Sequence, residues 1–94
     1  MYIWKYDFAV LDDFEIMMPM NSQVLCVQMQ LGNPCMWVLT SGDTSNTEER
    51  HFVIFGTGHP IQEEGLFYIG TFQQSREWGN SLVWHLFERI ENGR

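Results

Sequence analysis

The string Gly56-Thr57-Gly58-His59-Pro60 contains the residue types in this chain that could most readily hold a ligand. Glycines allow positive φ and leave successive backbone N–H groups free to point at an anion. His59 could add a hydrogen-bond donor, and Arg50 could reach this loop from the preceding strand. The string lacks the Lys-Ser/Thr pair of a phosphate-binding loop, so a tight turn ended by Pro60 is the favoured interpretation.

A second candidate is the polar segment 74–81, in which Trp78 lies two residues after Arg76. A tryptophan near an arginine is typical of a contact hot spot or of a surface that stacks a base. A tryptophan that folds back as a lid is the alternative, and both interpretations stay open. The ligand contacts expected from the sequence are therefore Arg50, Gly56, Thr57, Gly58, His59, Arg76 and Trp78.

The other reactive residue types show no catalytic or metal-binding pattern. No serine lies in a G-x-S-x-G elbow, and neighbouring carboxylates in loops do not indicate two acids facing each other across a cleft. Neither cysteine has a C-x-x-C partner, and no two histidines share a short ligand motif. We therefore expect no enzyme activity, no cofactor and no metal site among the histidines, which are His51, His59 and His85.

Short apolar runs separated by turn residues must position these side chains, and this spacing is typical of a β-sandwich or β-barrel. No window shows the apolar stripe of an amphipathic helix. Gly70 interrupts one run and predicts a bulge or a close backbone approach. We expect an all-β domain that spans residues 1–94, with Trp37 and Trp84 in its core. It should contain about seven short, mainly antiparallel strands, at 2–8, 14–18, 24–31, 35–40, 50–55, 66–73 and 82–87.

The two cysteines are predicted to be too far apart for a disulfide. A hairpin that turns at residues 32–34 puts Cys35 opposite about Leu31, with Cys26 about five residues further along its strand. At the rise of a β-strand this is about 16 Å, whereas a disulfide needs Cα atoms within about 7 Å. Free thiols fit a reducing compartment, so we expect a cytoplasmic protein.

Composition narrows the classes of partner. The 94 residues are 45% hydrophobic and carry a formal net charge of −7, which disfavours nucleic-acid binding and favours a basic protein surface as partner. No stretch approaches the roughly 20 apolar residues of a membrane span, and the N-terminus lacks the pattern of a signal peptide, so we expect no membrane association.

Several strings together resemble a family of short phage-encoded proteins of unknown function. The fairly specific ones are Phe55-Gly56-Thr57-Gly58-His59-Pro60-Ile61 and Tyr68-Ile69-Gly70-Thr71-Phe72-Gln73, and the similarity covers nearly the whole chain. The loops 43–49 and 74–80 are least like the family. The resemblance implies a phage or prophage setting and expression in the cytoplasm of an infected host cell, and it supplies no catalytic residues.

The hypothesis that combines these observations is a non-enzymatic binding protein that sequesters a small nucleotide-like signalling molecule as a counter-defence sponge. A domain of this size has little room for an internal pocket, so we expect a homo-oligomer with the pocket between protomers. The alternatives are an acidic interaction module that inhibits a basic host defence protein, and a minor virion component. Acidity, small size and the absence of a catalytic motif motivate the interaction module, whose acidic side chains would meet a basic surface.

Overall fold

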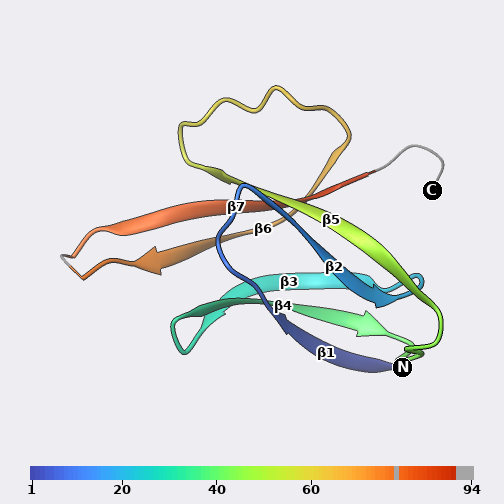
Figure 1. Ribbon diagram of the computed structural model, residues 1–94. Helices are drawn as coiled ribbons and strands as arrows, with labels where there is room; N and C mark the ends of the chain where they lie inside the picture. The colour runs from blue at the N-terminus through green and yellow to red at the C-terminus, as the bar shows by residue number, and fades with distance from the viewer. Residues whose placement is uncertain (78, 91–94) are drawn as a thin grey trace.

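The computed structural model describes residues 1–77 and 79–90 and confirms the all-β prediction (Figure 1). Within these residues no helix has the length and apolar character needed to cross a membrane. All strand pairings are antiparallel. The seven strands are β1 (Tyr2–Asp7), β2 (Asp13–Pro19), β3 (Gln23–Gln30), β4 (Asn33–Thr40), β5 (Thr47–Gly56), β6 (Leu66–Ser75) and β7 (Ser81–Arg89).

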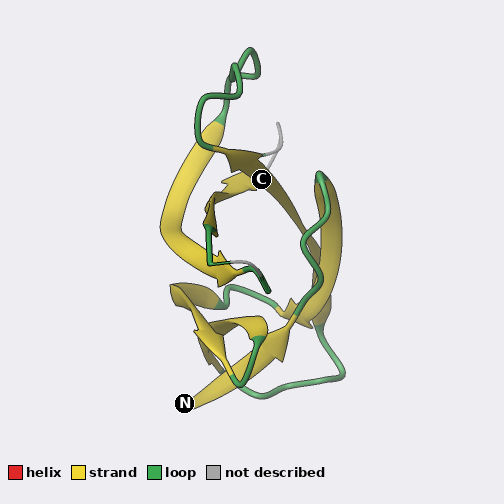
Figure 2. Ribbon diagram, turned by 90° about the vertical axis from the view of Figure 1, so that its left-hand side faces the viewer, coloured by secondary structure: helices red, strands yellow, loops and turns green. Residues whose placement is uncertain are grey.

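The strands form two sheets that face each other (Figures 1 and 2). One sheet has three strands in the order β1-β4-β3, and the other has four in the order β2-β5-β7-β6. The β6–β7 hairpin extends beyond the end of the three-stranded sheet, as Figure 1 shows on its left. Part of the inner face of the four-stranded sheet is therefore left without a covering strand.

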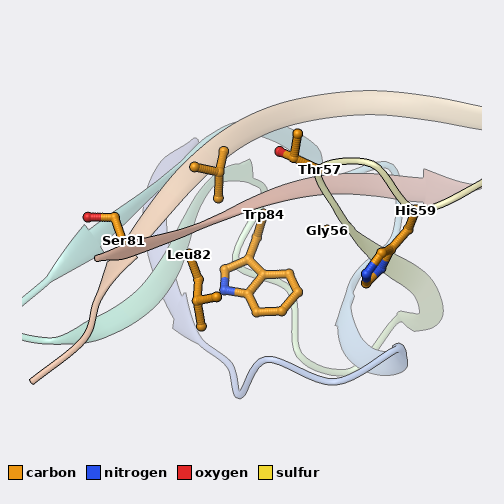
Figure 3. A pocket seen from close by; sticks show the side chains of 7 residues that line it. Gly56, Thr57, His59, Ser81, Leu82 and Trp84 are labelled. Carbon is orange, nitrogen blue, oxygen red and sulfur yellow. The ribbon is translucent and has the colours of Figure 1, made fainter. Parts of the chain in front are cut away.

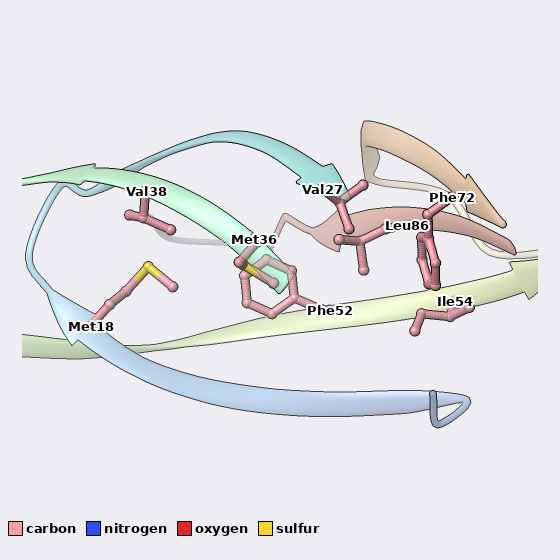
Figure 4. Packing of buried hydrophobic residues seen from close by; sticks show 8 residues of the cluster. All are labelled: Met18, Val27, Met36, Val38, Phe52, Ile54, Phe72 and Leu86. Carbon is pink, nitrogen blue, oxygen red and sulfur yellow. The ribbon is translucent and has the colours of Figure 1, made fainter. Parts of the chain in front are cut away.

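The core fills the space between the two sheets, because alternate residues of each strand point inward. Phe52 on β5 is fully buried and stacks on Phe14 of β2, with ring centroids 5.5 Å apart. Trp84 packs against this core as expected, but Trp37 is not in the cluster, because it lies between two inward-facing residues of β4 and points to the other face. The buried cluster in Figure 4 consists of Met18, Val27, Met36, Val38, Phe52, Ile54, Phe72 and Leu86.

The β3–β4 hairpin turns earlier than predicted. Leu31 and Gly32, with φ of 51° and 84°, form a two-residue turn of the kind that favours positive φ at both positions. Strand β4 therefore begins before Pro34, and Cys35 pairs with Gln28 rather than with Leu31. In this register the Cα atoms of Cys26 and Cys35 are about 8 Å apart, rather than about 16 Å as predicted. Both thiols are free.

Gly70 has both features that its position predicted. The pairing of β6 with β7 shifts register between Tyr68 and Gly70, which is a β-bulge or a similar irregularity. A Cβ atom on Gly70 would lie 2.8 Å from Cγ1 of Val27 on β3. Because β3 and β6 belong to different sheets, this contact brings two sheet edges together and partly closes the sandwich at that side.

Candidate functional site

A hollow of about 320 Å³ lies where β5 ends and β7 begins (Figure 3). Leu82 and Trp84 alternate with outward-facing residues of β7 and so belong to the inner face of the sheet. Both are only partly buried. The lining residues are Gly56, Thr57, His59, Ser81, Leu82, Val83 and Trp84.

The glycine-containing string forms a tight turn at the rim of this hollow. The backbone N–H of His59 donates to the carbonyl of Gly56 at 3.1 Å, and Gly58 has a φ of 89°, which is typical of the third position of a type II turn. The backbone N–H of Thr57 donates to the carbonyl of Val83 at 3.3 Å. The fold thus uses two of the N–H groups that an anion cradle would need.

A chain of hydroxyl and imidazole groups anchors the turn on its outer side. The Oγ1 atom of Thr57 lies 2.8 Å from Nε2 of His85, and Nδ1 of the same ring lies 2.9 Å from Oγ1 of Thr71. The hydroxyl of Tyr68 lies 2.6 Å from the Thr71 oxygen. Both ring nitrogens of His85 therefore have hydrogen-bond partners, and the turn is tied to β7 and β6 by side chains as well as by backbone.

The absence of a side chain at Gly56 leaves room for two rings. An ideal Cβ on Gly56 would lie 3.0 Å from Cε1 of His59 and 3.3 Å from Cζ3 of Trp84. The indole N–H of Trp84 donates to Oε1 of Gln74 at 3.1 Å, which fixes the orientation of the ring. The hollow therefore offers an imidazole, an oriented indole and aliphatic carbon.

The predicted ligand residues are only partly brought together. Thr57 and His59 line the hollow together with Gly56, and Gly58 lies between them in the turn. Arg76 lies in the β6–β7 turn, where its backbone N–H donates to the carbonyl of Asn80, next to the pair formed by Ser75 and Ser81. Trp78 lies outside the described residues.

Arg50 is not near the hollow, because its side chain is held inside the opposite end of the four-stranded sheet. Two guanidinium nitrogens donate to the two carboxylate oxygens of Glu88, and Nη1 donates to the carbonyl of Ser22 at 2.7 Å. Glu48 adds a second carboxylate 3.6 Å from Nη1. The bond to Glu88 raises the pKa of the guanidinium above its ordinary value, so Arg50 is a charged structural residue.

The structure also brings together three residues that sequence reasoning did not combine. Glu15 on β2 is the direct cross-strand partner of His51 on β5, and Glu49 precedes His51 by two residues on the same face. The Nε2 atom of His51 lies 3.1 Å from a carboxylate oxygen of Glu49, and Nδ1 lies 3.7 Å from one of Glu15. The spacing Glu49-x-His51 is visible in the sequence and places both residues on one face of a strand. Glu15 joins them only through the register in which β2 pairs with β5.

The geometry defines a β-protein with a shallow, ring-lined hollow at the junction of β5 and β7. The chain belongs to the family described as a domain of unknown function, DUF7352, whose model matches residues 1–94. No curated protein and no solved structure matches the chain.

Proposed function

We propose that this protein is a non-enzymatic binder of a small nucleobase-containing molecule, and that the base is held in the hollow between Gly56 and Trp84. The observation that carries the proposal is the pair of rings around Gly56, where an added Cβ would crowd both the imidazole of His59 and the indole of Trp84. Aromatic faces bind planar bases by stacking, which contributes about 1–3 kcal/mol per base.

The size and polarity of the hollow favour the base over the phosphate part of such a ligand. Its volume of about 320 Å³ is near the lower end of ligand pockets, which span roughly 300–1,000 Å³. No lysine or arginine lies among its lining residues, which all belong to the described part of the chain. Arg76, in the hairpin turn next to the Ser75–Ser81 pair, is the cation that we expect to meet a phosphate.

The biological setting in this proposal comes from the resemblance to phage-encoded proteins. Binding without turnover would lower the free concentration of a nucleotide-like signal in an infected cell. Its lining residues come from β5, the turn that follows it and β7, so a second copy of the chain could cover the hollow and form a homo-oligomer. This closure would also remove partly exposed apolar surface of Leu82 and Trp84 from water.

The proposal is tested by following the indole N–H signal of Trp84 by NMR while nucleosides and nucleoside monophosphates are added. Replacing Trp84 by phenylalanine assigns the signal. We expect a saturable shift in the wild-type protein. Gly56→Ala should weaken binding severalfold, because its methyl group crowds both rings while the backbone at this position needs no positive φ.

The matched control is Ile61→Ala, which changes an exposed apolar residue in the loop after the turn that does not line the hollow. It should leave the titration unchanged. The proposal is refuted if millimolar nucleosides and nucleotides leave the Trp84 signal unmoved, or if the wild-type protein and Gly56→Ala bind with equal affinity.

A further inference from the structure

We propose that the outer face of β2 and β5 carries a binding site for a divalent transition-metal ion, with Glu15, Glu49 and His51 as its ligands. The site is independent of the hollow, because these residues point to the solvent side of the sheet whereas Trp84 lies on its inner side. It was not expected from the sequence, in which no two histidines share a ligand motif.

The geometry brings one ligand atom from each residue close together. The three atoms, one imidazole nitrogen and two carboxylate oxygens, all lie within 4.8 Å of one another. Ligands bound to zinc at roughly 2.0–2.2 Å in tetrahedral geometry lie about 3–4 Å apart. The Glu49 oxygen lies by Nε2 and the Glu15 oxygen by Nδ1, so one carboxylate must rotate toward the nitrogen that the other faces for all three to bind one ion.

The backbone positions of the ligands are fixed by regular strand pairing. Glu15 and His51 face each other across β2 and β5, and Glu49 lies beside them because residues two apart in a strand share a face. The imidazole is the least exposed member, with 21% of its side chain accessible, whereas the two glutamate side chains are 57% and 50% accessible. A metal ion would thus bind at a partly buried imidazole and remain accessible to solvent.

The local charge favours a doubly charged cation. The two carboxylates bring two negative charges, and the imidazole between them contributes at most one positive charge. Asp13 on the same face of β2 adds a further acid, while Arg89 on β7 pairs with Glu63 through both Nε and Nη2. A divalent ion balances both carboxylates and replaces their mutual repulsion by attraction.

The ligand types select the class of metal. An imidazole together with carboxylates suits Zn²⁺ and neighbouring transition metals, whereas Ca²⁺ and Mg²⁺ are bound through oxygen atoms alone. Three protein ligands leave a tetrahedral ion one open position, which water or a donor from a partner molecule would fill. The ion would also link β2, an edge strand, to β5 by coordination bonds.

The experiment is a titration of the full chain with Zn²⁺ at pH 7.5, measured by calorimetry in a buffer that does not bind zinc. We expect one ion per chain, and we expect the imidazole nitrogen signals of His51 to shift on addition. Glu15→Gln and His51→Ala should each weaken binding about tenfold or more, since each removes a ligand but leaves the strand pairing intact. Glu64→Gln, in the exposed loop before β6, is the control and should bind zinc as the wild type does.

The inference is overturned if the wild-type protein takes up no zinc at millimolar concentration. It is equally overturned if Glu15→Gln and His51→Ala bind zinc as tightly as Glu64→Gln does. Thermal unfolding gives an independent check, because an ion that binds only the folded state raises its Tm. That increase should occur in the wild type and in Glu64→Gln but not in His51→Ala.

Discussion

The buried ion pair between Arg50 and Glu88 leads to the prediction with the largest expected effect on stability. The two side chains are 10% and 9% accessible, and they join β5 to β7 in the middle of the four-stranded sheet. Replacing Glu88 by glutamine keeps the shape of the side chain but removes its negative charge. The buried guanidinium would then keep the carboxylate of Glu48, at 3.6 Å, the carbonyl of Ser22 and the neutral amide oxygen of the glutamine as acceptors.

Removing one partner of a buried pair typically costs about 3–5 kcal/mol, because the other charge is left uncompensated away from water. The remaining carboxylate of Glu48 places the expected cost for Glu88→Gln near the lower end, at about 3 kcal/mol. A domain of this length has roughly 5–14 kcal/mol of total stability, so the loss is a large fraction of it. With a urea dependence of about 1.5 kcal/mol/M, the unfolding midpoint should fall by about 2 M.

The chain contains a matched control in the second bidentate pair, Arg89 with Glu63, whose side chains are each 34% accessible. Pairs as accessible as this one contribute little to stability, so Glu63→Gln should lower the urea midpoint far less than Glu88→Gln does. Equal midpoints for Glu88→Gln and Glu63→Gln would refute the reasoning. Replacing both buried partners by apolar residues, as Arg50→Met with Glu88→Leu, should restore most of the loss.

Three further predictions concern single sites. The hydrogen bond from Arg89 lowers the pKa of Glu63. The bond therefore stabilises the folded state fully above the ordinary glutamate pKa of 4.5, and this stabilisation is lost as the pH falls through the lowered pKa. An NMR titration that finds an ordinary pKa for Glu63 would contradict this prediction. Burial, and then the hydrogen bond to Asp7, raises the pKa of Cys35, which is only 1% exposed. Iodoacetamide should therefore label Cys26 of the native protein before Cys35, as measured by mass spectrometry. Gly70→Ala should destabilise the fold by about 1–3 kcal/mol through its clash with Val27, and adding Val27→Ala should cost clearly less than the sum of the two single changes in urea unfolding.

Local patterning was sufficient for the elements but not for their pairing. Alternation and turn residues placed all seven strands, because strand formation near a turn depends on residues adjacent in the chain. The β3–β4 turn was misplaced, because Pro34 was interpreted as a turn residue. In the structure Leu31 and Gly32 make the turn and Pro34 lies in the short strand β4, with Trp37 facing away from the core.

In the candidate site, too, the local turn was predictable from the sequence, whereas the contacts between distant strands were not. The tight turn at residues 56–60 and the glycine within it were visible in the sequence, because they depend on local backbone preferences. The other side of the hollow is formed by Trp84. This residue lies beside Gly56 only because β7 pairs with β5, although more than 25 residues separate the two in the chain. Arg50 was assigned to the wrong neighbourhood for a related reason, since residues six apart in an extended strand are about 20 Å apart.

The sequence by itself determined that this protein is a small acidic β-domain with a tight glycine turn, because composition and short-range periodicity express local chemistry. The tertiary structure alone decided which charges are buried together, which rings surround Gly56 and which acids lie beside His51. Each of these juxtapositions depends on the order and register of strands that are distant in the chain. Order and register result from packing the whole core at once, and no local window of residues contains that information.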